Sequence, residues 1–512
     1  MKGFYKNIDK TVFFIGGVIC LFFICWTVIS PSQVGQFFSM ILSVFSVDFG
    51  WLYLLAVAFF IVFLLTLAFG KYGKIILGKD TDKPEYSTFA WFFMLFAAGM
   101  GIGLVFWSVA EPMTHYLNPP YGAGSTSESA SLAMRYAFTH WGVHPWATYG
   151  IIGLPLAYYQ FRKNQPALLS SCVAPLIGKK RVGSILGSVI DVLAVVATVF
   201  GVATSLGLGA MQINSGLYYV FGVPCNHTVM FGIIAITTVL FISSSVSGID
   251  KGIRILSDTN MVIMGILLVF VFFSGATLFV TNFFVDSIGK YLTHIVSASF
   301  WTDPFGESDG WLSGWTVFYW AWWLSWGPFV GGFIARISKG RTIREFVFGT
   351  LFCPMLLCFV FMAIMGGNAI HFDLQGVSSI ADAMQVDVSY ALFALLDQFP
   401  LAKVSSLLAI MLIVVFFITS ADSSTFVCAM MTAKGMQNPP AALKIFWGVT
   451  EGVVAAVLLY VGGLSAIQST AIVIAFPLLF IALMMAAALI KSLRSELLEI
   501  DRGILPKKEP GK

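Results

Sequence analysis

The sequence predicts an all-α polytopic membrane protein with twelve transmembrane helices. Composition, the spacing of apolar stretches and the placement of basic residues each point to this class. Of the 512 residues, 58% are hydrophobic and only 11% are charged, whereas soluble domains contain about 25% charged residues. So few ionic side chains cannot cover a globule of this size, and we therefore expect the chain to lie in a lipid bilayer.

The apolar stretches give the number of helices, because a helix that crosses the hydrocarbon core needs ~20 mostly apolar residues. Twelve stretches meet this requirement: 11–30, 50–69, 88–109, 140–161, 185–210, 228–247, 259–282, 315–336, 345–366, 404–431, 441–462 and 466–491. The first stretch is long enough to span and no small-residue cleavage pattern follows it, so we expect no cleavable leader.

The basic residues test this count. If the N-terminus is cytoplasmic, 26 of the 29 lysines and arginines fall on cytoplasmic segments, and the exceptions are Arg135, Lys290 and Lys403. One missed or invented span would destroy this bias. The positive-inside rule therefore predicts twelve helices in the cell membrane, with the N- and C-termini both in the cytoplasm.

Several classes of function lack support. A net charge of +4 spread over many loops does not indicate a nucleic-acid surface, and the seven cysteines form no paired metal motif. His140 and His144 are four residues apart, but no third ligand is in view, so we do not expect zinc. Because we find no nucleophile, metal cluster or acid pair, we expect neither an enzyme nor a cofactor. An ion channel remains an alternative, which solute-coupled transport would exclude.

Glycines interrupt two of the predicted spans. The third contains "FAAGMGIGLVFW", with Gly99, Gly101 and Gly103 at every second position, and the eighth contains "WGPFVGG". Each glycine weakens a helix by ~1 kcal/mol, and the two segments lie five spans apart. Broken helices at matching places in two halves are typical of inverted-repeat transporters with a site near the bilayer midplane. Close helix packing through small residues is the alternative.

Aromatic residues gather in the same parts of the chain. "GWTVFYWAWWLSWGPF", residues 314–329, holds five of the fourteen tryptophans, and Tyr319, Trp322, Trp323 and Trp326 fall on one helical stripe. In the fourth span, "HWGVHPWATY" places Trp146 and Tyr149 on one face, and Pro145 frees Trp141 to turn toward them. These rings could form a cage, or they could simply pack a large helical core.

An aromatic cage suits a quaternary ammonium group, which has no N–H to donate. Three cation–π contacts at about 2 kcal/mol each supply ~6 kcal/mol, whereas a micromolar Kd requires ~8 kcal/mol. Another part of the solute must therefore be bound. An unwound backbone at Gly99, Gly101 and Gly103 can present N–H groups to an anion. A solute with one methylated cationic end and one anionic end is a betaine.

Hydroxyl groups in the tenth span, "VVFFITSADSST", suggest a coupling ion. Thr419 and Ser420, together with carbonyls of an unwound segment, make a neutral oxygen cage suited to a monovalent cation. Thr198 in the fifth span offers a similar group. Bonds from these hydroxyls back to their own helices are the alternative. Asp191, Asp422 and Glu451 are the acids nearest the membrane interior, and each is either functional or a structural partner at a helix end.

The motifs "GWTVFYWAWW", "AAGMGIG", "HWGVHPWATY", "ATVFG", "ARISKGRTIREF" and "FFITSADSS" resemble those of the betaine/choline/carnitine transporter family, most closely its sodium-coupled glycine betaine carriers. The similarity extends from about residue 50 to residue 491. It implies a homotrimer of twelve-helix protomers with a LeuT-like inverted five-plus-five repeat in helices 3 to 12 and two preceding helices.

The resemblance also divides the chain. It implies a transporter domain over 11–491, with segments as follows: cytoplasmic N-terminus 1–10, two peripheral helices 11–69, first repeat 88–282, extracellular-side amphipathic connection 283–314, second repeat 315–491 and short cytoplasmic tail 492–512.

Site residues are likewise implied by the resemblance. The aromatic box would consist of Trp141, Trp146, Tyr149 and Trp323, with Trp322 and Trp326 lining the site and its path. Further substrate contacts would come from Ala98, Gly99, Met100, Gly101 and Ile102. One sodium ion would bind Ala97, Met100, Phe416, Thr419 and Ser420, and a second would involve Thr198 and Phe329.

Departures from family patterns refine the expectation. Val202 stands where some sodium-coupled relatives carry a second threonine, which leaves the second sodium site open. Gly103 stands where proton-coupled choline carriers tend to have an acidic residue. The segment "SDTNMV" has no arginine, whereas sodium-independent carnitine exchangers have one near the start of the seventh span. We therefore expect a sodium symporter that imports glycine betaine for osmoprotection. Transport of carnitine, choline or a sulfonium analogue by the same fold, proton-coupled or by exchange, is the alternative.

Overall fold

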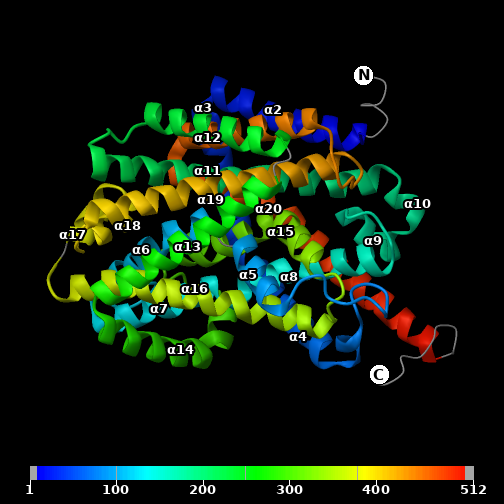
Figure 1. The fold of residues 1–512 in the computed structure, drawn as a ribbon, viewed down its shortest axis with the longest axis horizontal. Coiled ribbons are helices and arrows are strands. Elements are labelled where there is room, and N and C mark those ends of the chain that lie inside the picture. The colour runs from blue at the N-terminus through cyan, green and yellow to red at the C-terminus, as the bar shows by residue number, and fades with distance from the viewer. Residues whose placement is uncertain (1–7, 100, 248–249, 378, 502–512) are drawn as a thin grey trace.

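The protein is a bundle of helices, most of which run along its long axis (Figure 1). The structure is a computed structural model and describes residues 8–99, 101–247, 250–377 and 379–501. Within these residues, extended pairing is limited to an isolated bridge between Ile76 and Thr342. The all-α class predicted from composition is confirmed.

The described residues before the connection at residue 275 form twelve α-helices and three short helical turns. Their bounds are α2 (Lys10–Ile29), α3 (Pro31–Ser43), η1 (Val44–Asp48), α4 (Gly50–Phe69), η2 (Lys71–Lys74), α5 (Thr88–Gly99), α6 (Ile102–Leu117), α7 (Ser127–Trp141), α8 (Val143–Ala157), η3 (Tyr158–Arg162), α9 (Leu169–Ile177), α10 (Lys179–Val182), α11 (Ile185–Phe221), α12 (His227–Ser247) and α13 (Asp250–Ser274).

The second half begins with a helix over the expected connection between repeats. The bounds are α14 (Thr277–Phe300), η4 (Ser313–Val317), α15 (Phe318–Ile337), α16 (Ile343–Leu374), α17 (Ser379–Val386), η5 (Val388–Tyr390), α18 (Ala391–Leu396), α19 (Ala402–Thr432) and α20 (Ala441–Asp501).

Each of the twelve predicted spans falls on one or more of these helices. Among the described residues, eight helices are long and apolar enough to cross a membrane, and the bent pair α5 and α6 would make a ninth. Helix α20 contains two predicted spans, which meet at a kink where Gly462 and Gly463 leave the helical conformation. Gly463 has a φ of +54°, and residues with a side chain rarely adopt such a positive value. The chain is a multi-pass membrane protein, and the count of twelve crossings and the repeat stay predictions.

Three predicted boundaries are wrong. The range 88–109 contains the break between α5 and α6 that its glycines predict, but α6 continues past residue 109 to Leu117. The range 140–161 crosses Gly142, where α7 ends and α8 begins. The seventh range runs to residue 282, but α13 ends at Ser274 and α14 starts at Thr277, because the Asn368 side chain accepts a hydrogen bond from the Ala276 N–H at 2.8 Å.

Helix α15 lies at the centre of the bundle. It packs closely along α8 and also against α11, α20 and α5. Every residue from Phe318 to Gly331 is buried, so this part of the tryptophan-rich segment has no exposed side. In Figure 1, α5, α8 and α15 meet near the middle of the molecule. The predicted site therefore lies deep between helices.

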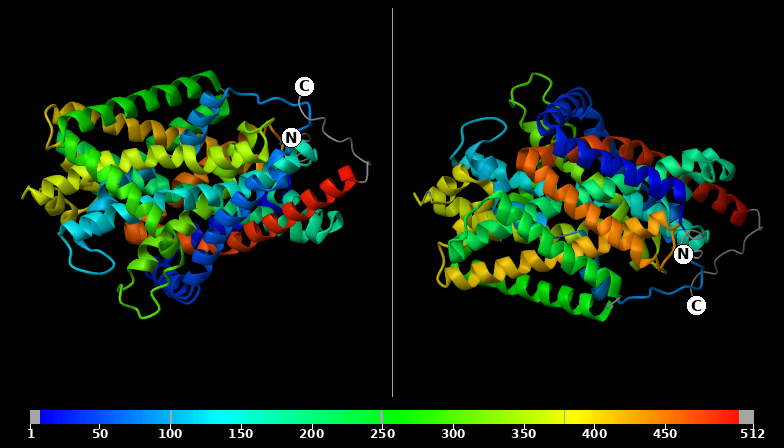
Figure 2. Two further views of the ribbon diagram at one scale, coloured as in Figure 1. Left: turned by 90° about the horizontal axis from the view of Figure 1, so that it is seen from below. Right: turned by 90° about the horizontal axis from the view of Figure 1, so that it is seen from above.

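Both ends of the described chain lie at the same end of the bundle. The first turn of α2 and the last turns of α20 are on the right in Figure 1, and α20 extends beyond its neighbours there (Figure 2). This placement agrees with an even number of crossings. The cytoplasmic orientation of that end stays a prediction.

Candidate substrate and ion site

Four aromatic rings from three helices form the candidate box. Trp141 ends α7, Trp146 and Tyr149 lie on α8, and Trp323 lies on α15. The Trp323 ring centroid is 4.9 Å from that of Trp141 and 6.1 Å from that of Tyr149, and the planes are nearly perpendicular in both pairs. Tyr149 and Trp146 are 5.7 Å apart in a similar edge contact. The structure thus brings together the four predicted rings, and all four are buried.

The break after Trp141 comes from backbone geometry rather than from Pro145 alone. Gly142 has a φ of −84° and a ψ of −141°, which ends the helix. The Tyr291 hydroxyl accepts a hydrogen bond from the Val143 N–H at 3.3 Å on the far side of this break. Trp141 is consequently held at a helix terminus next to the first turn of α8.

Two further tryptophans continue the row on α15. Trp322 stacks on Trp323 at 4.8 Å with planes 17° apart. Trp326 makes an edge contact with Trp322 at 6.4 Å and donates its indole N–H to the Gly201 carbonyl at 2.8 Å. Trp326 is therefore fixed to α11.

The glycine run lies directly against these rings. A Cβ at Gly99 would come within 2.5 Å of Trp146, and one at Gly103 would come within 2.5 Å of Trp322. No real Cβ atom adopts such contacts, so only glycine fits at both positions. Gly101, between them, faces the Ser420 hydroxyl of α19. The interruption thus connects the aromatic site to the expected ion site.

The remaining residues of this segment divide into three groups. Ala97 is half-buried. Ile102 is buried, and its side chain approaches Gly209 of α11 rather than the rings. Met100 and the side chain of Ala98 lie outside the described residues.

The expected hydroxyl ligands of sodium lie on α19 and α11. The Thr419 hydroxyl donates to the Val415 carbonyl at 2.9 Å, and the Thr198 hydroxyl donates to the Ala194 carbonyl at 2.8 Å. Both bonds return to the residue's own helix, as the alternative interpretation holds. A hydroxyl that donates one bond keeps lone pairs for a cation, so these oxygens still fit a monovalent ion.

Phe416 and Phe329 differ in their surroundings. Phe416 lies one turn before Thr419 on α19 and is mostly buried. The Phe329 ring packs against Trp326 at 5.7 Å and therefore lies beside the tryptophan row.

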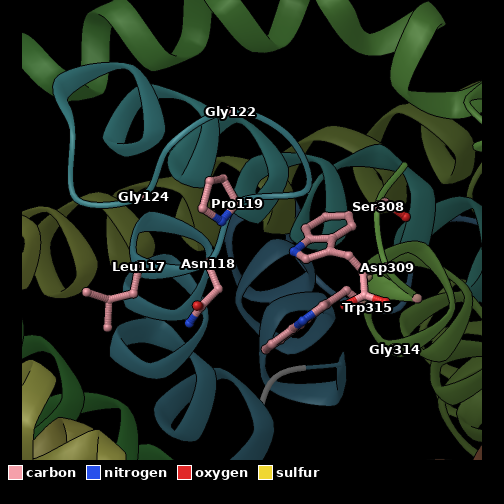
Figure 3. A pocket seen from close by; sticks show the side chains of 11 residues that line it. Leu117, Asn118, Pro119, Gly122, Gly124, Ser308, Asp309, Gly314 and Trp315 are labelled. Atoms are coloured by element: carbon pink, nitrogen blue, oxygen red, sulfur yellow. The ribbon is translucent and has the colours of Figure 1, made fainter. Parts of the chain in front are cut away.

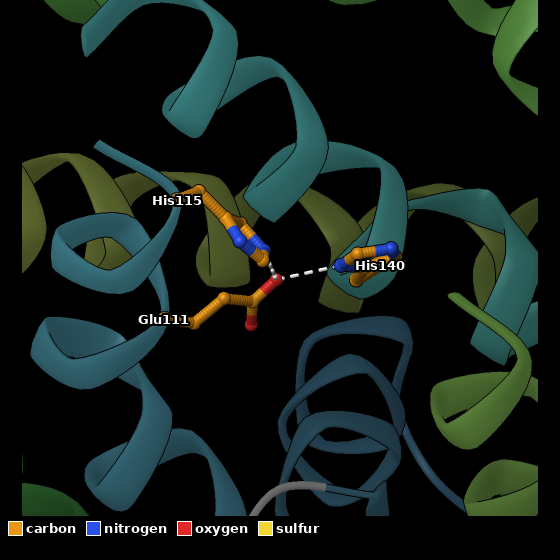
Figure 4. A group of neighbouring side chains, drawn as sticks. All are labelled: Glu111, His115 and His140. Carbon is orange, nitrogen blue, oxygen red and sulfur yellow. Dashed lines mark hydrogen bonds and ion pairs between the residues drawn. The ribbon is translucent and has the colours of Figure 1, made fainter. Parts of the chain in front are cut away.

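A buried carboxylate that sequence reasoning missed lies behind the box. Glu111 of α6 accepts hydrogen bonds from the Trp141 indole N–H at 2.7 Å and from the Tyr319 hydroxyl. His140 Nδ1 lies 2.7 Å from its Oε1 and His115 Nε2 lies 3.3 Å from the same oxygen, as Figure 4 shows.

The sequence held a signal for this residue. The third span was expected to end at residue 109, whereas α6 continues to Leu117 and buries Glu111, His115 and Tyr116. An acid inside a membrane helix is a functional candidate by default. The polar "AEPMTHY" sequence lowered the local hydropathy and hid the helix extension.

The two histidines expected as a pair separate. His140 joins Glu111 and His115, whereas His144 Nε2 bonds the Ser299 hydroxyl at 2.7 Å. The statement that His140 lacks a third ligand-type neighbour is therefore wrong. Both oxygens of Glu111 are already engaged, and we assign this group as a hydrogen-bond network rather than a metal site.

Two of the other intramembrane acids make local contacts. Asp191 accepts from the Ser170 backbone at 3.1 Å and from its hydroxyl at 2.6 Å, which fits the structural-partner interpretation. Glu451 accepts from the Thr425 hydroxyl at 2.8 Å. Neither contact connects to the aromatic box.

A cavity of about 520 Å³ lies between the loop after α6 and the segment before α15 (Figure 3). Its walls include Leu117, Asn118, Asp309, Trp311 and Trp315. The Trp311 and Trp315 rings lie 4.7 Å and 4.5 Å from the His115 ring. The cavity is thus separated from the box by these two indoles and the Glu111 network.

Comparison with known proteins shows the family of this chain. The model of the BCCT family, the betaine/carnitine/choline family transporters, matches residues 11–498. A probable glycine betaine transporter of Desulfitobacterium hafniense (strain Y51) is 46% identical over 496 residues, which cover 96% of this chain and 99% of the relative.

Two further relatives are similar over nearly their whole length. The glycine betaine transporter OpuD of Bacillus subtilis (strain 168) is 48% identical over 495 residues, 96% of each chain. An ectoine/hydroxyectoine transporter of Virgibacillus pantothenticus is 42% identical over 490 residues, 95% of this chain and 97% of the relative. Because the family and these relatives are transporters, the protein is a transporter and not an enzyme. The chain belongs to the betaine/carnitine/choline transporter family.

Proposed function

We propose that this protein is a sodium-driven symporter that imports glycine betaine as an osmoprotective solute by alternating access, as a homotrimer in the cell membrane. One observation supports the proposed substrate: four aromatic rings meet beside the glycine run, those of Trp141, Trp146, Tyr149 and Trp323. Rings of this kind bind a methylated ammonium through their faces. The names of two relatives specify glycine betaine.

Unpaired donors support a zwitterionic solute. The Tyr149 hydroxyl and the Trp322 indole N–H are buried and have no hydrogen-bond partner among the described residues. Leaving a buried donor unpaired costs about 1–3 kcal/mol, and a carboxylate between them would satisfy both. These groups and the N–H groups of the glycine run would together bind the anionic end, which the aromatic box leaves free.

Sodium coupling is supported by the position of α19. Ser420 faces Gly101, so an ion held by Thr419, Ser420 and the carbonyls of the broken helix would contact the same segment that binds the solute. A ligand couples to another when both favour one conformation of a shared element. Filling one site would therefore order the glycine run for the other.

Uptake into proteoliposomes tests both parts. We expect labelled glycine betaine to accumulate only when an inward sodium gradient is imposed, and unlabelled betaine to compete. Choline, carnitine and ectoine serve as competitors, because an aromatic box recognises the charged head and not the tail. Accumulation driven equally well by a proton gradient would exclude sodium symport. Stronger competition by choline or ectoine than by betaine would reassign the substrate.

A further inference from the structure

The Glu111 carboxylate contacts two aromatic rings at the site but lies behind them and does not face the space that they enclose. Its Oε2 accepts from Trp141 and Tyr319, and its Oε1 is shared by His140 and His115. All five side chains are buried. Among the described residues, the two histidines are its only ion-pair partners, and neither lysine nor arginine approaches it.

The hydrogen bonds fit an ionised Glu111 with neutral histidines. An ionised carboxylate only accepts and has about four lone-pair sites, and its four partners fill them. If His140 donates from Nδ1, its Nε2 accepts from the Thr316 hydroxyl at 2.9 Å, so a neutral imidazole satisfies both contacts. The network then holds one net negative charge. Burying such a charge is costly without a basic partner, which points to a function.

The charge acts on the rings through their donor groups. Cation–π attraction comes from the negative face of the ring quadrupole. An N–H or O–H that donates to an anion is polarised, which moves electron density onto the ring and makes its face more negative. Trp141 is a wall of the box, and Tyr319 stacks on another wall, Trp323, at 5.7 Å with planes 27° apart. Both Glu111-bound rings therefore belong to the site.

A full negative charge also attracts a cation directly. Inside a protein the dielectric is far lower than in water, so a charge that lies behind one ring is still felt in the box. Trp141 lies between Glu111 and the enclosed space, because its N–H edge faces the carboxylate while its ring contacts Trp323. Glu111 can thus stabilise a cation without touching it.

We propose that Glu111 is a specificity-determining residue that makes the box prefer a permanently charged head group to a neutral group of the same shape. This inference rests on the proposed function, because it requires a cationic solute in the box. Glu111 acts through Trp141 and Tyr319 and is a positioning residue rather than a substrate ligand. A purely structural role would orient the rings equally well for a charged and a neutral ligand.

Two ligands separate these roles. Glycine betaine and 3,3-dimethylbutanoate share shape and carboxylate, but the second carries a tert-butyl group in place of trimethylammonium. Their Kd values are measured with purified protein by tryptophan fluorescence and by competition. In Glu111→Gln, which keeps an acceptor and loses the charge, we expect the Kd for betaine to rise ~10-fold. The Kd for the tert-butyl analogue should not rise by more than about 3-fold, because its head group carries no positive charge for Glu111 to stabilise. Equal changes in both Kd values, or none, would overturn the proposal.

Size-exclusion chromatography would detect misfolding of Glu111→Gln. A second variant tests the proposal if Glu111→Gln does not fold. Tyr319→Phe keeps the ring and the carboxylate but removes one polarised donor, so the same selective loss should appear at roughly 2–5-fold. Tyr53→Phe is the matched control, because the Tyr53 hydroxyl bonds the Ile472 carbonyl at 2.8 Å, away from the box. If the wild type binds no betaine, the proposed function fails as well. If it binds betaine and both variants keep wild-type discrimination, this inference fails alone.

Discussion

Gly99 lies against the indole of Trp146 so closely that a Cβ at position 99 would stand 2.5 Å from Cη2 and 2.7 Å from Cζ3 of that ring. The Tyr149 ring is the next neighbour, at 3.3 Å. The broken segment between α5 and α6 therefore forms part of the wall that holds the box rings in place. Any side chain there must displace a ring that is itself fully buried.

Gly99→Ala should reduce betaine uptake by at least ~10-fold, because a misplacement of about 1 Å in a binding geometry can cost up to ~100-fold. Initial uptake rates in proteoliposomes measure the effect. Gly232→Ala is the matched control, since Gly232 is helical and a Cβ there meets open space. Equal uptake by both variants would show that the ring can move without consequence.

The helical class and the twelve apolar ranges could be predicted from the sequence, because apolar length is a property of one segment. The four rings of the box lie on distant segments, and their meeting was implied by the family resemblance. The Glu111 network could not be predicted in the same way, because His140 and Glu111 are 29 residues apart and meet through packing of α6 on α7. Helix ends at Gly142 and Ser274 also depend on side chains from distant helices, such as Tyr291 and Asn368.

Trp323→Leu should raise the apparent KM for betaine by roughly 3–30-fold, because one cation–π contact contributes about 0.5–2 kcal/mol. Trp323→Phe keeps a π face, so its KM should lie between those of the wild type and Trp323→Leu. Uptake rates over a range of betaine concentrations measure KM. Trp51→Leu is the control, since Trp51 is exposed on α4 and bonds only the Asp48 carbonyl among the described residues. An unchanged KM in Trp323→Leu would remove this ring from the site.

Thr419→Ala combined with Ser420→Ala should abolish the sodium dependence of uptake, because both hydroxyl ligands of the proposed ion are lost. The sodium concentration for half-maximal uptake is the measurement. Thr450→Ala is the matched control. Its hydroxyl also bonds back to its own helix, to the Phe446 carbonyl at 2.7 Å, but it lies on α20 with no proposed ion. Sodium dependence that survives in the double variant would contradict the assigned ligands.

An ion-pair cluster joins the end of α8 to the last turns of α20. The Glu496 carboxylate bonds the Tyr158 hydroxyl and Lys163 Nζ, each at 2.7 Å, and also pairs with the Arg162 guanidinium. Arg162 in turn bonds the Gly78 carbonyl at 2.8 Å. Burial alone would raise the pKa of Glu496, but the bonds from Lys163 and Tyr158 and the two positive charges outweigh burial and lower it.

The lowered pKa fixes the sign of a pH effect on stability. A carboxyl group whose pKa is lower in the folded state stabilises the fold above its unfolded pKa of about 4.3, and this stabilisation is lost as the pH falls through the folded value. Glu496→Gln should therefore lower the Tm at pH 7 by roughly 2–5 °C. The difference from wild type should shrink below about pH 4. Thermal unfolding of the purified protein, followed by fluorescence over this pH range, is the measurement.

Glu499→Gln is the matched control and should match the wild type throughout. Glu499 lies one turn further along α20 and, among the described residues, bonds only Ser495, at 3.3 Å. A Tm difference that is the same at pH 7 and pH 3.5 would show that the Glu496 charge does not stabilise the fold.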